Sequence, residues 1–113
     1  MHNYPTTCRI HALLALSVAA QVLVAAAAAD PDTAKIESGR KLVTESKCEA
    51  CHASKVGGDG SDIYSRKDRR VTSRSKLLPQ VAYCNSQLNL GLFPEDEAAI
   101  AAYLNSRHYK FKD

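Results

Sequence analysis

The sequence predicts a small domain made only of helices. Three segments, residues 31–46, 73–88 and 94–104, combine helix-capping residues with apolar side chains at helical spacing. No stretch shows the alternation of a strand over a useful length, and no internal repeat is visible. At 113 residues the chain is long enough for one domain.

The first 29 residues have the layout of a secretory signal peptide. Arg9 gives a weakly basic start, and residues 12–29 form an uncharged, mostly apolar run that ends in alanines. This pattern predicts cleavage after Ala29, which would leave a domain of residues 30–113 without a membrane span. The alternative is a retained anchor, since a run of about 18 residues is at the lower limit for crossing a bilayer. Arg9 is the only charged residue of the segment, so its removal lowers the net charge from +3 to +2.

The first expected helix, residues 31–46, has two candidate caps and an internal glycine. Asp32 or Thr33 can cap its start, and Glu37 can support its first turn. Gly39 lies inside the segment, where a glycine costs about 1 kcal/mol relative to alanine. A glycine at such a position often marks the close approach of another backbone.

The middle of the chain, residues 53–72, is expected to be rich in loops. It contains a turn cluster at residues 57–62 and few large aliphatic side chains. A domain so poor in apolar mass is expected to need a metal, a disulfide or a cofactor as a staple. A series of basic residues lies at the end of this segment and just beyond it: Arg66, Lys67, Arg69, Arg70, Arg74 and Lys76.

A second helix is expected at residues 73–88, with Ser73 or Ser75 as its cap. Pro79 is expected close to the start of this helix, because proline is tolerated in a first turn and disruptive later. One stripe at helical spacing would face the core: Leu77, Val81, Cys84 and Leu88.

The last helix has the clearest boundaries. Pro94 stands at the first helical position, where its missing N–H is harmless. The acidic residues 95–97 follow it, and they favour the positive end of a helix. Arg107, His108 and Lys110 place positive charge near the other end, and His108 is expected to be solvated there.

The strongest chemical signal is Cys48-Glu49-Ala50-Cys51-His52, a C-x-x-C-H sequence. Two cysteines three residues apart can add their sulfurs to the two vinyl groups of one haem, and the adjacent histidine can bind the iron. A redox dithiol would need a βαβ context, which is absent from the sequence pattern. A zinc site would need a second pair of ligands, for which only Cys84 and His108 remain after cleavage.

With these features the sequence resembles class I c-type cytochromes over essentially all of residues 30–113. The matching segments are "GRKLVTESKCEACH", the glycine-rich middle and "EDEAAIAAYLNSR". The resemblance implies a small all-α cytochrome c fold, in which the N- and C-terminal helices cross around one covalently bound haem c. It implies that Gly39 meets an aromatic residue of the last helix, here Tyr103. Cys48 and Cys51 would hold the haem, and His52 would be the proximal iron ligand.

One departure from this family concerns the second axial ligand, which is usually a methionine. Met1 is the only methionine and would leave with the signal segment. Cys84 stands where the methionine is expected and is our candidate for the iron ligand. The alternatives for Cys84 are a buried structural cysteine or a disulfide with another chain. Asn85, His108 or a lysine are further candidate ligands, and the sixth position could also stay open.

The resemblance implies a periplasmic one-electron carrier rather than an enzyme. Two other functions remain open: a haem protein that binds small ligands at an open or weakly ligated sixth site, and a haem subunit of a larger oxidoreductase, for example in sulfur-compound oxidation. The segment 66–76 could dock an acidic redox partner or could simply be a solvated loop. The mild net charge argues against nucleic acid as a partner.

Overall fold

The computed structural model describes residues 29–112, and these residues confirm the all-α prediction. The helices are α1 (Pro31–Glu45), α2 (Cys48–Val56), α3 (Asp62–Ser65), α4 (Arg74–Leu88) and α5 (Pro94–Leu104), followed by the π-helical turn η1 (Asn105–Tyr109). No strand occurs in this part of the chain. The predicted signal segment lies outside the described residues except for Ala29. Within residues 29–112, no helix combines the length and the apolar character that a membrane crossing would need.

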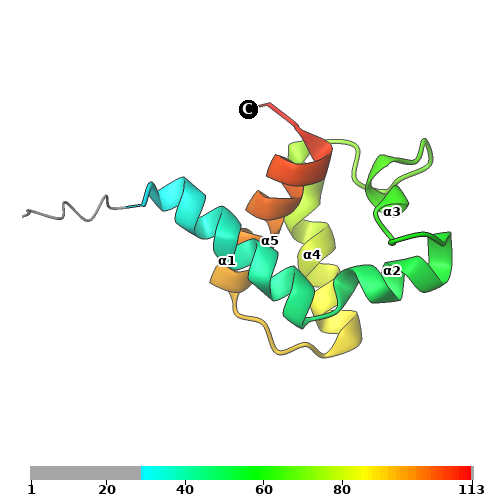
Figure 1. Ribbon diagram of the computed structural model, residues 1–113, viewed down its shortest axis with the longest axis horizontal. Coiled ribbons are helices and arrows are strands. Elements are labelled where there is room, and N and C mark those ends of the chain that lie inside the picture. The colour runs from blue at the N-terminus through cyan, green and yellow to red at the C-terminus, as the bar shows by residue number, and fades with distance from the viewer. Residues whose placement is uncertain (1–28, 113) are drawn as a thin grey trace, which may run out of the picture.

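Helices α1 and α5 cross at Gly39, as the sequence predicts. A methyl group built on Gly39 would collide with the carbonyl group of Ala99 and would lie 2.9 Å from Cβ of Tyr103. The α1–α5 contact is the most extensive between helices, and Figure 1 shows the two crossing beside α4. Only a residue without a side chain allows the two backbones to approach this closely.

Helix α4 packs against α5 and contributes two side chains to the buried core, Leu77 and Val81. Pro79 is the sixth residue of α4, so the prediction that it lies near the helix start was wrong. The burial of Leu77 and Val81 on either side offsets the backbone hydrogen bond that the proline removes. The predicted apolar stripe is only partly buried, because Leu88 at its end is 52% exposed.

The middle of the chain holds more helix than the sequence predicts. Helix α2 continues to Val56, and the short helix α3 follows the turn cluster. Gly60 supports α2, since a methyl group there would lie 3.0 Å from Cβ of His52 and 2.7 Å from N of Ala53. The loop therefore packs directly against the backbone of the C-x-x-C-H helix.

Helix α1 begins at residue 31 as predicted, but its capping residue differs from the prediction. Oδ1 of Asp30 accepts hydrogen bonds from the backbone N–H groups of Asp32 and Thr33, at 2.8 and 3.4 Å, so Asp30 is the cap. Pro31 explains the shift, because proline suits the first helical position and moves the cap to the residue before it. Glu37 does not support this first turn and instead accepts a hydrogen bond from Arg40 at 2.8 Å.

Two asparagines hold the segments that follow α4 and α5 in the same manner. The side-chain amide of Asn85 donates to the carbonyl of Leu92 at 2.9 Å and accepts from its N–H at 3.1 Å. Asn105 makes the same pair of hydrogen bonds with Phe111, at 3.1 and 2.9 Å. These paired bonds fix the loop before α5 and the tail after η1 without any regular secondary structure.

Candidate functional site

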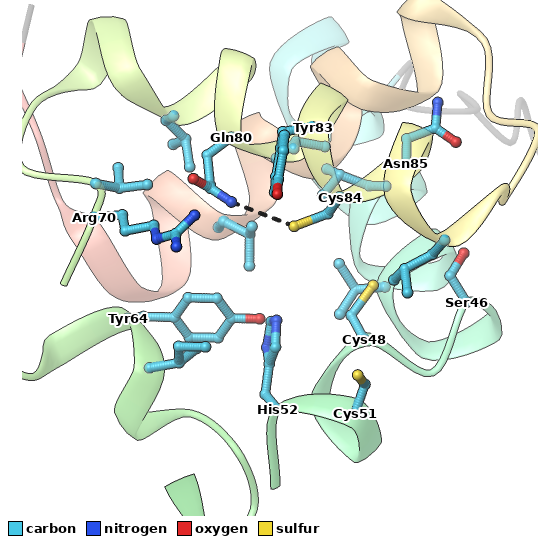
Figure 2. A pocket seen from close by; sticks show the side chains of 18 of the residues that line it. Ser46, Cys48, Cys51, His52, Tyr64, Arg70, Gln80, Tyr83, Cys84 and Asn85 are labelled. Carbon is cyan, nitrogen blue, oxygen red and sulfur yellow. Dashed lines mark hydrogen bonds between the residues drawn. The ribbon is translucent and has the colours of Figure 1, made fainter. Parts of the chain in front are cut away.

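A cavity of about 440 Å³ lies between α2, α4 and the segment that follows α3. This volume falls in the range of about 300–1,000 Å³ that is typical of ligand and cofactor pockets. Figure 2 shows side chains of several elements directed into it. Its apolar lining includes the partly buried Ile63 and most of the buried core: Val43, Tyr64, Val71, Leu77, Val81, Ile100 and Leu104.

The C-x-x-C-H residues form one wall of this cavity. Lys47 adopts a left-handed backbone conformation, with φ of 53°, and turns the chain from α1 into α2. Cys48 and His52 are one helical turn apart, so both side chains lie on the same face of α2 and reach the cavity. Cys51 also lines the cavity but is exposed.

His52 points into the cavity beside the ring of Tyr64 (Figure 2). The two rings meet edge to face, with 5.4 Å between their centroids. Nδ1 of His52 is buried and has no hydrogen-bond partner among the described residues. Burial lowers the pKa of His52, against a smaller opposing effect of Glu49. The imidazole is therefore held neutral near pH 7, which is the form that binds a metal ion.

Cys84 lines the cavity from α4, on the side opposite α2. Its sulfur accepts a hydrogen bond of 3.5 Å from Nε2 of Gln80, one helical turn earlier. The structure thus brings the predicted ligand Cys84 into the same cavity as Cys48, Cys51 and His52. All three thiols are free, and the described residues contain no preformed cluster of three ligands that could hold a metal ion.

Asn85 lines the edge of the cavity, but its side chain points away from it (Figure 2). In addition to the paired bonds with Leu92, its amide nitrogen donates to Oε1 of Glu97 at 2.7 Å. The amide group that a metal ion would need is therefore already engaged in tying α4 to α5. This arrangement disfavours Asn85 as an iron ligand.

His108 is only 17% exposed at its side chain, so the prediction of a solvated histidine was wrong. The π-helical turn places its ring against Tyr64, with centroids 4.4 Å apart. Its Nε2 is buried without a hydrogen-bond partner and lies 3.9 Å from Oε1 of Glu49. Burial lowers the pKa of His108, while Glu49 raises it to a smaller extent. His108 is not among the residues that line the cavity.

Three residues of the predicted basic series, Arg66, Arg69 and Arg70, line the cavity. Arg66 pairs with Asp68 at 3.2 Å, and Nε of Arg69 donates to the carbonyl of Val71 at 3.1 Å. Figure 2 shows the guanidinium of Arg70 directed toward the interior of the cavity. Half of the series thus contributes to the cavity wall, whereas Lys67, Arg74 and Lys76 do not line it.

Two further polar residues, Gln80 and Tyr64, line the cavity, and the sequence alone did not place them there. Gln80 was missed, although its position four residues before Cys84 puts it on the same face of α4. The hydroxyl of Tyr64 is buried and has no hydrogen-bond partner within the described chain. Burial raises the pKa of Tyr64, so the phenol stays a donor at neutral pH.

The residues around the cavity fit a haem by their chemistry. The thiols and the imidazole suit covalent attachment and iron binding, and the apolar wall suits a porphyrin ring. The phenol of Tyr64 and the guanidinium of Arg70 are donors that suit carboxylate groups.

Comparison of the chain with protein-family models, curated proteins and solved structures found no match.

Proposed function

We propose that this chain is a monohaem c-type cytochrome of class I that carries single electrons in the periplasm. One observation carries the proposal: Cys48, Cys51 and His52 open onto an apolar cavity that Cys84 faces from α4. The predicted export segment, residues 1–29, supports an oxidising compartment outside the cytoplasm.

The side chains of α2 would hold the group. Cys48 and Cys51 would form the two thioether links, and His52 would bind the iron through a ring nitrogen. When bound, the haem supplies an iron that alternates between two oxidation states. The apolar residues of the cavity would exclude water from the porphyrin faces, while Tyr64 and Arg70 would donate hydrogen bonds to its carboxylates.

Cys84 is our candidate for the second axial ligand. It lies on the opposite side of the cavity from α2. The hydrogen bond from Gln80 would orient its sulfur. A thiolate ligand donates electron density and would lower the reduction potential. The basic residues beside the cavity would steer an acidic redox partner toward it.

The decisive experiment is to produce the full chain in a host that attaches haem and to extract the product with acidified acetone. We expect a red protein that keeps its colour, whereas the double variant Cys48→Ser/Cys51→Ser should lose all covalently bound pigment. Cys84→Ser is the matched control, since it should retain the pigment and change only the oxidised spectrum. A colourless wild-type protein, or pigment that washes out, would contradict the proposal.

A second measurement on the same protein separates a carrier from a ligand-binding haem protein. Carbon monoxide added to the reduced wild type should leave the spectrum unchanged over minutes if Cys84 occupies the sixth position. Rapid binding would favour the ligand-binding function. An unchanged spectrum in Cys84→Ser would remove Cys84 as the ligand.

A further inference from the structure

No hydrogen bond within the described residues fixes Nδ1 of His52, although this atom is buried. A histidine that binds a metal ion usually has its other ring nitrogen held by a hydrogen bond, which sets the orientation of the ring. Here packing takes that part. A methyl group on Gly60 would lie 3.0 Å from Cβ of His52, and the imidazole meets the ring of Tyr64 edge to face (Figure 2). The orientation of His52 therefore depends on what holds Tyr64.

Tyr64 is also placed by ring contacts. Its side chain is buried, and its hydroxyl has no hydrogen-bond partner in the described part of the chain. The ring of His108 lies against it with centroids 4.4 Å apart and 32° between the planes. Tyr109 meets it edge to face, with 5.8 Å between the centroids. Both contacts come from the π-helical turn η1, and such turns are rare in proteins and occur frequently at functional sites.

His108 is itself fixed from three elements. Its ring lies between Tyr64 of α3 and Tyr103 of α5, which it meets edge to face with centroids 6.4 Å apart. Its Nε2 lies 3.9 Å from Oε1 of Glu49 on α2. Because these contacts come from different directions and the side chain is mostly buried, the ring has little freedom to turn.

We propose that His108 is a positioning residue that fixes the orientation of the His52 ring through the ring of Tyr64. The three rings form a continuous series in which each packs on the next. Aromatic rings in contact prefer a small number of relative orientations, so the plane of one ring restricts the plane of its neighbour. The role depends on the flat ring of His108 and not on its charge.

The consequence for the haem rests on the proposed function. His52 would bind the iron through a ring nitrogen, and rotation of the imidazole about that bond changes the electronic structure of the iron. A single ring orientation would give one sharp low-spin signal in the electron paramagnetic resonance of the oxidised protein. Loss of the ring of His108 would free Tyr64 to move and would broaden or shift that signal.

The first test needs no haem. The full chain carries four histidines, so His2→Gln and His11→Gln leave His52 and His108 as the only reporters when histidine is isotope-labelled. In the nuclear magnetic resonance spectrum, the ring current of Tyr64 displaces the ring protons of His52 from the positions of an unstructured histidine.

We expect His108→Phe to keep the His52 signals of the parent chain and His108→Ala to move them toward the unstructured position. His108→Leu, which restores volume without a flat ring, should act like His108→Ala and serves in its place if that variant does not fold. Asn85→Ala controls for a general loss of stability, since it removes hydrogen bonds to Leu92 and Glu97 and should leave the His52 signals in place.

Two outcomes of this test would overturn the inference. One is an unchanged His52 signal in both His108→Ala and His108→Leu, which would show that Tyr64 keeps its place without a ring behind it. The other is an equal shift in His108→Phe and His108→Ala, which would show that the flat ring is not the part that matters.

The second test uses the haem-loaded chain and its electron paramagnetic resonance. We expect His108→Phe to retain the wild-type signal and His108→Ala to broaden or shift it, with the pigment attached in both. Identical signals in all variants would overturn the effect on the iron. The two proposals fail separately: a colourless wild-type protein contradicts the cytochrome while the haem-free test still decides the role of His108, and a red protein whose His52 signals ignore His108 contradicts only the positioning role.

Discussion

The crossing of α1 and α5 and the cavity beside α2 represent two opposite kinds of packing in one small domain. At Gly39 there is no room for a single methyl group, because the carbonyl group of Ala99 and Cβ of Tyr103 occupy the space. Beside α2 there is a cavity of about 440 Å³. The buried polar atoms without partners belong to His52 and Tyr64, which line the cavity, and to His108, which packs against Tyr64. The chain fills the first region by itself, whereas the second retains open space beside polar atoms that lack partners.

The core reflects this division. No large side chain among the described residues is completely enclosed, and even Val43, Leu77 and Ile100 retain 3% exposure. These three residues line the cavity as well as the core. The interior of the domain is therefore continuous with the cavity, and a bulky group there would complete the core.

The largest loss of stability is expected for Gly39→Ala, which tests how closely α1 and α5 pack at their crossing. The added methyl group would lie 2.5 Å from the carbonyl carbon of Ala99, so the helices must separate. Urea unfolding should show a loss of about 3 kcal/mol. The exposed neighbour Ser38 is the control, since Ser38→Ala should change stability by no more than about 0.5 kcal/mol. Equal stability of the two variants would show that the crossing can relax.

A smaller loss, about 2 kcal/mol, is expected for Asn85→Ala. The substitution removes two hydrogen bonds to the backbone of Leu92 and one to Glu97, and leaves part-buried groups without partners. The exposed residue Gln87, on the same helix, serves as control through Gln87→Ala. If both variants unfold at the same urea concentration, the side chain of Asn85 is not structural and becomes available again as a ligand.

Tyr64→Phe tests the cavity directly. Its effect on stability should have opposite signs in the haem-free and the haem-loaded chain. In the haem-free chain the variant should be more stable by about 1 kcal/mol, because it removes a buried hydroxyl that lacks a partner. In the haem-loaded chain we expect a loss of similar size, since the phenol would then donate to the haem. Tyr83→Phe, at a half-exposed position, should change neither form. Stabilisation of both forms would exclude Tyr64 as a donor to the haem.

The smallest effect is expected for the pH dependence of the haem-free chain. Burial lowers the pKa of His52 and His108 below the ordinary value of 6.5, so the folded chain binds fewer protons than the unfolded chain as the pH falls. The free energy of unfolding should be nearly constant between about pH 7 and 8 and should decrease as the pH falls below about 6.5.

His108→Phe sharpens this prediction, because it keeps an aromatic ring against Tyr64 and removes one titrating group. Unfolding by urea from pH 5 to 8 should give a shallower decrease for this variant than for the wild type. The charged residues near His108 are Glu49, Asp59, Arg107 and Lys110, and they are unchanged in it. Identical profiles would mean that His108 is solvated, as the sequence alone suggests.

Local signals in the sequence were sufficient for much of the fold. Pro94 with its three following acids marks the start of α5, and Gly39 marks the helix crossing. The sequence failed where long-range packing overrides a local preference. Pro79 lies deep in α4, and Leu88 is exposed although it continues an apolar stripe.

The candidate site could be predicted only in part. The C-x-x-C-H spacing indicates Cys48, Cys51 and His52 as candidate haem-binding residues. Because Met1 is the only methionine, Cys84 becomes the candidate for the second ligand.

Gln80 was missed although it lies one helical turn before Cys84. The orientation of Arg70 and the packing of His108 on Tyr64 depend on elements far apart in the chain. No local pattern reports such contacts.

The sequence by itself determined the helical class of the domain, the position of its C-x-x-C-H segment and the glycine at the crossing of α1 and α5. These features depend on neighbours within a few residues, where spacing and side-chain chemistry are sufficient. Only the tertiary structure decided that Cys84 shares a cavity with Cys48 while Asn85 is turned away to hold Leu92. Adjacent residues on a helix point in different directions, and which of them faces the cavity follows from how α4 packs against α5.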